Sequence, residues 1–130
     1  MTVSTAARPS RPVGHDPLRG GVRFLAELVA WVAVPWALWP RSPMLAIAAV
    51  LVLVVPPAVS GTPGDRPGGD PPVAAPGAVT IASVLAHLVG AVTAAWVLWP
   101  TAVAIAVTVL CIAVVVSEQP RWRALLGRRR

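Results

Sequence analysis

Two ionisable side chains, Glu27 and His87, lie inside long apolar runs of the chain, where they are best placed to do chemistry. Ionisable groups inside a bilayer are costly, so they mark either a functional group or a structural tie. A glutamate can bind and release a proton, and a histidine changes its charge near neutral pH. Arg23 precedes Glu27 by one helical turn, which also allows a simple ion pair. These three residues form a candidate intramembrane polar cluster, for which structural tying and proton handling are both open.

The two runs that carry Glu27 and His87 look like two copies of one unit. At an offset of 60 positions, the segment WALWP at 36–40 matches WVLWP at 96–100, including two Trp and one Pro. A second apolar run follows each copy, at 44–59 and 102–116. Repeated helical hairpins are known from transporter-like membrane folds. Glu27 and His87 occupy equivalent positions in the two copies, so we expect them at similar depth and within reach of one another.

The composition favours a lipid environment. Hydrophobic residues make up 56% of the 130 residues and charged residues only 12%. A soluble domain of this length could not bury so much apolar surface. The formal net charge is +6, and all of the basic residues are arginines. They cluster at the two ends of the chain beside apolar runs, so we expect the lipid bilayer, and not nucleic acid, as the partner.

The pattern predicts an all-α protein, a four-transmembrane-helix bundle built from two repeated helical hairpins. Residues 1–15 are predicted to form a disordered cytoplasmic tail, 16–118 the membrane domain and 119–130 a basic interfacial tail. The predicted helices cover residues 17–39, 44–59, 78–98 and 101–116. The first would be roughly 34 Å long, enough to cross a bilayer.

Local signals set the predicted boundaries. Asp16 suits a helix N-cap, and Pro17 suits the first helical position because the missing N–H has no partner there. Pro56 and Pro57 should bend or end the second helix. The Pro- and Gly-rich segment 60–77 is predicted to be a loop with neither a helix nor a regular strand. A helix ending near Glu118 leaves the RWRALLGRRR tail to lie on the membrane surface.

The arginine distribution predicts the topology. Four spans put both termini and the middle loop on one side of the membrane, and the opposite side carries only Arg41. The positive-inside rule therefore places both termini in the cytoplasm, with anionic lipids at the C-terminal tail. We expect five tryptophans to act as interfacial anchors. They are Trp36, Trp39, Trp96, Trp99 and Trp122.

Signals for catalysis are absent from the sequence. It has no Gly-rich phosphate loop, no His pair at metal-binding spacing and a single cysteine, Cys111, which reads as a small buried hydrophobe. We therefore expect no enzymatic activity, no cofactor and no metal.

The stretch Arg23-Phe24-Leu25-Ala26-Glu27-Leu28, with the Trp-rich turn and the Pro56-Pro57 break, resembles the YrdB-like family of small four-helix bacterial integral membrane proteins. The resemblance covers roughly residues 18–126. His87 stands where an acidic residue would suit the family pattern, and the middle loop is longer. The resemblance implies a four-helix fold and a membrane location. It implies no activity, because the family has no assigned biochemical function.

Two hypotheses of function follow. The first is a structural, accessory or interaction subunit of the cytoplasmic membrane, with a membrane protein or a second copy of the chain as partner. The alternative is a small proton-coupled transporter that acts as an oligomer. The strong arginine bias argues against an antiparallel dual-topology dimer, because such proteins need both orientations to insert.

Overall fold

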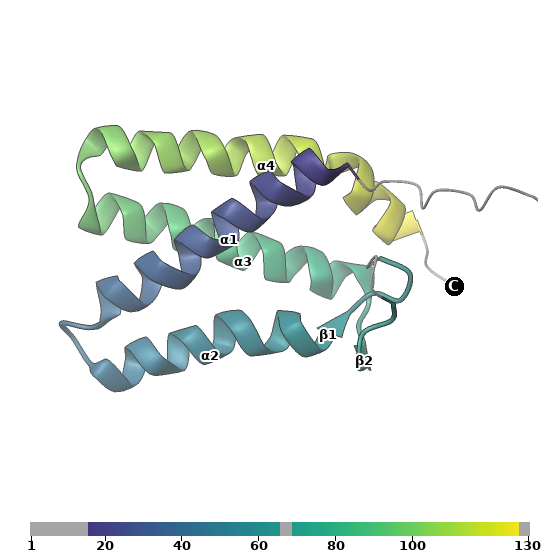
Figure 1. Ribbon diagram of the computed structural model, residues 1–130, viewed down its shortest axis with the longest axis horizontal. Coiled ribbons are helices and arrows are strands. Elements are labelled where there is room, and N and C mark those ends of the chain that lie inside the picture. Colours follow the sequence, from purple (N-terminus) through teal and green to yellow (C-terminus); the bar gives the residue numbers. More distant parts are fainter. Residues whose placement is uncertain (1–15, 66–68, 128–130) are drawn as a thin grey trace, which may run out of the picture.

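The computed structural model describes residues 16–65 and 69–127, and its fold is all-helical (Figure 1). The four helices are α1 (Pro17–Leu38), α2 (Pro43–Val59), α3 (Gly77–Leu98) and α4 (Thr101–Gly127). The predicted N-terminal tail, Arg66 of the middle loop and the three terminal arginines lie outside the described residues.

The helices begin where capping chemistry allows. The Asp16 carboxylate accepts a hydrogen bond from the Leu18 N–H at 3.0 Å, and Pro17 takes the first position of α1, as predicted. Ser42 caps α2 in the same way through the Leu45 N–H. These caps satisfy backbone donors that have no partner inside the helix.

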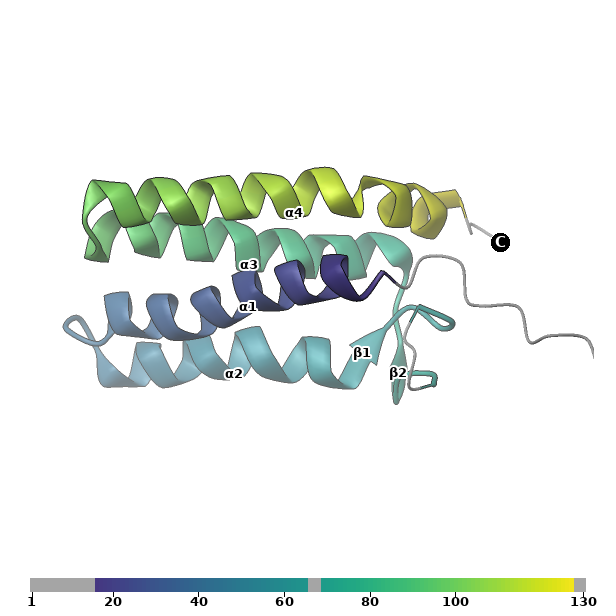
Figure 2. The ribbon, with the colours of Figure 1, turned by 45° about the horizontal axis from the view of Figure 1, so that its top comes forward.

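Helices α1 and α3 form the centre of the molecule. Both views show them between α2 and α4, with α2 against α1 and α4 against α3 (Figures 1 and 2). Small residues allow the close approach of the central pair, because a Cβ placed on Gly90 of α3 would lie 3.1 Å from Cγ2 of Val34 on α1. The fully buried positions are alanines on both helices: Ala26, Ala30, Ala33, Ala91 and Ala95.

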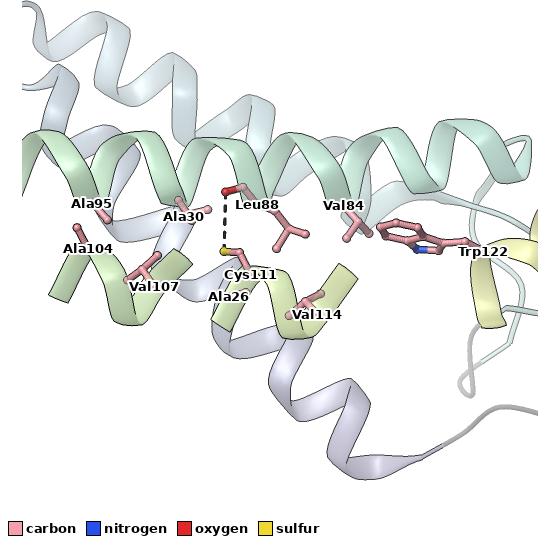
Figure 3. Close-up of a cluster of buried hydrophobic side chains, with 11 residues drawn as sticks. Ala26, Ala30, Val84, Leu88, Ala95, Ala104, Val107, Cys111, Val114 and Trp122 are labelled. Carbon is pink, nitrogen blue, oxygen red and sulfur yellow. Dashed lines mark hydrogen bonds between the residues drawn. The ribbon is translucent and has the colours of Figure 1, made fainter. Parts of the chain in front are cut away.

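The buried core runs along the junction of α1, α3 and α4. It contains small and medium-sized side chains, with Trp122 beside Val84 at one end (Figure 3). Cys111 is buried there, and its Sγ lies 3.9 Å from the Leu88 carbonyl oxygen. The interpretation of Cys111 as a small buried hydrophobe is therefore confirmed.

The outer surface is apolar. Large side chains such as Met44, Val52 and Val116 are at least two-thirds exposed. Three helices, α1, α3 and α4, are long and apolar enough to cross a membrane, whereas α2 is apolar but has only 17 residues. The exposed apolar exterior is what a protein solvated by lipid requires, since lipid tails are as apolar as the side chains they meet.

Helix α4 differs from its predicted extent, because it continues through Pro120 to Gly127 instead of ending near Val116. Figure 1 shows it bending near its yellow end, as expected where a proline removes one helical hydrogen bond. The continuation packs tightly on α3: a Cβ placed on Gly77 would lie 2.6 Å from the Leu125 carbonyl oxygen. Burial of this last segment therefore outweighs the helix-breaking effect of the proline.

The middle loop is also more ordered than predicted. Two-residue strands β1 (Ser60–Gly61) and β2 (Val73–Ala74) pair in parallel, with Ser60 opposite Val73. The Thr62 hydroxyl lies 3.0 Å from the Thr80 hydroxyl of α3, which ties the loop to the bundle. The loop, the start of α1 and the end of α4 all lie at the same end of the molecule (Figure 1).

Candidate functional site

Arg23 and Glu27 form the ion pair that their spacing predicts. The Arg23 Nε lies 3.5 Å from a Glu27 oxygen, one helical turn away on α1. The guanidinium also reaches α4, where its Nη1 lies 3.6 Å from a carboxylate oxygen of Glu118. Arg23 therefore joins two helices as well as neutralising Glu27.

Glu118 is predicted to lie at the end of a helix, but it is buried inside α4, with only 4% of its surface exposed. Arg121 pairs with it from one turn further along α4. Arg121 also binds Asp65 of the middle loop, with its Nε donating to Oδ1 at 2.8 Å and a second contact through Nη2. Arg121 is thus held between two carboxylates.

Together these side chains make a charged network that connects α1, α4 and the middle loop. Its members are Arg23, Glu27, Asp65, Glu118 and Arg121. Three carboxylates and two guanidinium groups leave it with a formal charge of −1. Buried charges are tolerated when each has an opposite charge beside it, and removal of one partner leaves the other unpaired at a large cost. The network therefore locks three segments that are distant in the sequence.

His87 is buried, with 3% of its surface exposed, and both ring nitrogens face backbone carbonyls. Nδ1 lies 2.7 Å from the Ser83 oxygen on the same helix, and Nε2 lies 2.8 Å from the Leu53 oxygen on α2. A neutral ring with its proton on Nε2 donates to Leu53, and a doubly protonated ring donates to both oxygens.

A proline explains why the Leu53 carbonyl is available. In an α-helix this oxygen would accept from the backbone N–H four residues later, but that residue is Pro57, which has none. His87 therefore supplies the donor that Pro57 lacks. This bond also bridges α2 and α3, which otherwise make few contacts.

The structure does not join His87 to Glu27. Across residues 16–65 and 69–127, no hydrogen bond or ion pair links the two side chains. The offset of 60 residues predicts contact between them, but Glu27 pairs with Arg23 on its own helix, and His87 contacts carbonyl oxygens of α3 and α2. Glu27 is bound to the charged network, whereas His87 is bound to carbonyl oxygens.

Four of the predicted tryptophan anchors lie at the end of the molecule opposite the middle loop, near the two tight turns. Trp36, Trp39 and Trp96 are more than half exposed. Trp99 is partly buried and meets Trp36 edge to face, with ring centroids 6.3 Å apart. Exposed tryptophans in this position suit a membrane interface.

Trp122 differs from the surface anchor that sequence analysis expected. It is 7% exposed and belongs to the buried cluster beside Val84 (Figure 3). Because α4 continues past Pro120, helical periodicity places Trp122 on the same face as Cys111 and Glu118, toward the core.

One signal in the sequence points to the part of the network that the sequence did not predict. Glu118 and Arg121 are three residues apart, the spacing of neighbours on one helix face. Asp65 had no such signal, because its contact with Arg121 depends on how the loop folds back over the bundle.

Comparison of the chain with protein-family models, with curated proteins and with solved structures finds no match.

Proposed function

We propose that this protein is a structural or accessory integral membrane protein of the bacterial cytoplasmic membrane, without catalytic activity. The proposal rests on the fact that the charged and ionisable side chains inside the bundle are paired with one another or with backbone groups. The buried or partly buried carboxylates of the charged network each have a guanidinium partner, and His87 is bonded to carbonyl oxygens. Such side chains are engaged in holding helices together and are not presented to a substrate.

The proposed topology has four spans with both termini in the cytoplasm. Arginines cluster toward both ends of the sequence, and the start of α1 and the end of α4 lie with the middle loop at one end of the molecule, whereas Arg41 lies in the turn at the other end. At 17 residues, α2 reaches the lower limit for a bilayer span. The two hairpins would be copies of one unit, as the match of residues 36–40 with 96–100 suggests, and the resemblance to the YrdB-like family supports a four-helix fold and a membrane location.

The alternative function is a small proton-coupled transporter. One observation favours it: His87 is an ionisable group buried between α2 and α3, where a mobile proton would need a carrier. Its two carbonyl contacts and the pairing of Glu27 with Arg23 favour the structural role instead, because each would have to break during a transport cycle.

Two measurements test the proposal. Reporter fusions after Thr2, Gly64 and Gly127 should all report the cytoplasmic side, and an external signal from the Gly64 fusion would contradict the topology. Purified protein in proteoliposomes should pass no protons under an imposed pH gradient, compared with protein-free vesicles. A flux that Glu27→Gln abolishes would overturn the structural role and establish the transporter.

Partners are sought by mild cross-linking in native membranes followed by purification of the full chain. We expect one or more membrane proteins, or a second copy, to be recovered in constant ratio. Recovery of the monomer alone, with its lipids, would contradict an accessory role.

A further inference from the structure

An apolar groove lies between α3 and α4, with a volume of about 360 Å³. Leu88 and Cys111, both almost fully buried, belong to its lining and lie close to one another in the buried cluster (Figure 3). Its walls include Val89 from α3 and Ile112 and Val116 from α4, all more than half exposed. This volume is at the small end of ligand pockets, which suits one slender chain better than a ring system.

The groove offers almost no polar groups to an occupant. Its polar lining residues are Thr93 of α3 and Thr108 of α4, and the Thr108 hydroxyl already donates to the Ala104 carbonyl at 2.8 Å and accepts from the Trp96 indole N–H at 3.1 Å. A hydrocarbon chain is therefore the chemistry that fits the groove, since a polar occupant would lose its hydrogen bonds to water there.

The groove face of α4 becomes polar and cationic toward the helix end. Gln119 and Arg123 follow Val116 at spacings of three and seven residues, which keeps them on the same face of the helix. Arg123 is exposed, and it has no acidic partner within the part of the chain that the structure describes. An unneutralised guanidinium at the end of a hydrocarbon groove complements an anionic amphiphile.

The helical segment that carries Arg123 is held against α3 by the residues on either side of it. Trp122 and Leu125 are buried, and the close approach of Leu125 to Gly77 keeps this part of α4 against the start of α3. On α3, the small residues Ala82 and Ala78 precede groove-lining Leu85 by three and seven residues. Both alanines are exposed, and their side chains are shorter than those of the groove walls.

We infer that the α3–α4 groove is a binding site for one anionic glycerophospholipid of the bilayer, with an acyl chain in the groove and its phosphate at Arg123 and Gln119. A second copy of this chain is a poorer occupant, because the carboxylates of its charged network are already paired with its own arginines. The inference rests on the proposed membrane location.

Native mass spectrometry of the full chain, released from detergent with equal amounts of phosphatidylglycerol and phosphatidylcholine, tests the site. We expect preferential retention of phosphatidylglycerol. Arg123→Gln should reduce that retention about fivefold, the weight of one arginine near an anionic surface, and leave phosphatidylcholine unchanged. Val89→Trp, which fills the groove, should reduce retention of both lipids. The matched controls are Arg41→Gln in the opposite turn and Val52→Trp on the exposed face of α2.

The outcomes separate the rival occupants. Retention that is the same in the parent, Arg123→Gln and Val89→Trp would show only unspecific lipid contact and overturn the site. A dimer in the parent that Val89→Trp dissociates would assign the groove to a second copy and also overturn the lipid site.

Phosphatidylglycerol with a photoreactive acyl chain should cross-link to α3 and α4 around Val89 and Ile112, and cross-links confined to α2 would contradict the site. Alkaline extraction of cell membranes first checks that the parent is membrane-integral, so a failure there counts against the proposed function and is distinguishable from a failure of the site.

Discussion

The first hairpin, α1–α2, and the second, α3–α4, differ in how proline affects their last helix. Helix α2 ends at Val59, directly after Pro56 and Pro57, whereas α4 continues beyond Pro120 to Gly127. Two successive prolines remove two helical hydrogen bonds and one proline removes a single bond, but this is only part of the difference. Beyond Pro120 come Arg121, which joins the charged network, and Trp122, which is buried. A helix therefore continues beyond a proline when the residues that follow make stabilising contacts with the rest of the protein.

The hairpins also differ at Glu27 and His87, the polar positions that an offset of 60 residues matches. Glu27 of the first hairpin is paired with Arg23 on its own helix, and through Arg23 it is connected to Glu118 of α4. His87 of the second hairpin donates to a carbonyl oxygen of the first. Each hairpin thus satisfies a polar group with help from the other, which makes the contact between them specific.

Of the substitutions considered, loss of the charge on Arg121 should reduce the free energy of unfolding most. Arg121 lies directly after Pro120 and holds the end of α4 to the charged network. Arg121→Met keeps an apolar stem but leaves Asp65 and Glu118 without their shared partner. We expect a loss of about 3 kcal/mol in the free energy of unfolding, because removal of one partner from a buried, hydrogen-bonded charge network is strongly destabilising. Titration of the detergent-solubilised protein with a denaturing detergent measures it.

Arg19→Gln is the matched control, since Arg19 pairs with Asp16 at a site where both side chains are about half exposed. It should change the free energy of unfolding by no more than about 1 kcal/mol. Equal effects of the two variants would mean that the network is only a surface feature and does not hold the end of α4.

A methyl group at the start of α3 should separate the α4 continuation from the bundle. In Gly77→Ala the new Cβ would meet the Leu125 backbone, which cannot rotate away as a side chain can. We expect a loss of about 1–3 kcal/mol, the usual range for overpacking. Gly20→Ala in α1, where nothing lies within 4 Å, should instead leave stability unchanged or raise it slightly. Proteolysis of the C-terminal segment would follow its release in the Gly77 variant.

The bond from His87 to α2 should depend on Pro57. His87→Ala leaves the Leu53 oxygen without a donor, at a cost of about 1–3 kcal/mol. In a Pro57→Ala background residue 57 regains its N–H, so the same histidine substitution should cost less. A double-mutant cycle measured by thermal unfolding gives the coupling, and additive effects would exclude this role for Pro57.

The same cycle between Glu27→Gln and His87→Ala should show effects that add within about 0.5 kcal/mol, because the two side chains share no partner. A coupling larger than that would indicate that they meet directly, as their repeat positions had suggested.

The smallest effect is expected where the hairpins are most alike, at the tryptophan end. Trp36→Leu removes the edge-to-face contact with Trp99, which is worth about 0.5–1.5 kcal/mol beyond the apolar area. Trp39→Leu, which has no ring contact in the described part of the chain, is the control. Equal melting temperatures for the two variants would mean that both rings serve as membrane anchors only.

Much of the fold could be read from local signals. Asp16 and Pro17 predicted the start of α1, because capping and proline chemistry act over one helical turn, and the second apolar run predicted a start of α2 at residue 44, one residue after its observed start at Pro43. The Arg23–Glu27 pair followed from a spacing of four residues. The end of α4 could not be read in this way, since the local preference of Pro120 competes with burial of Trp122 against another helix.

By itself, the sequence determined the helical character, the apolar exterior and the positions of the turns, because hydrophobicity, capping and proline geometry are properties of neighbouring residues. Only the tertiary structure decided which polar groups meet. Asp65 reaches Arg121 because the loop folds back, and His87 reaches the Leu53 oxygen because α2 lies at one particular height beside α3. Such contacts depend on the relative height and rotation of whole helices, which no local spacing along the chain encodes.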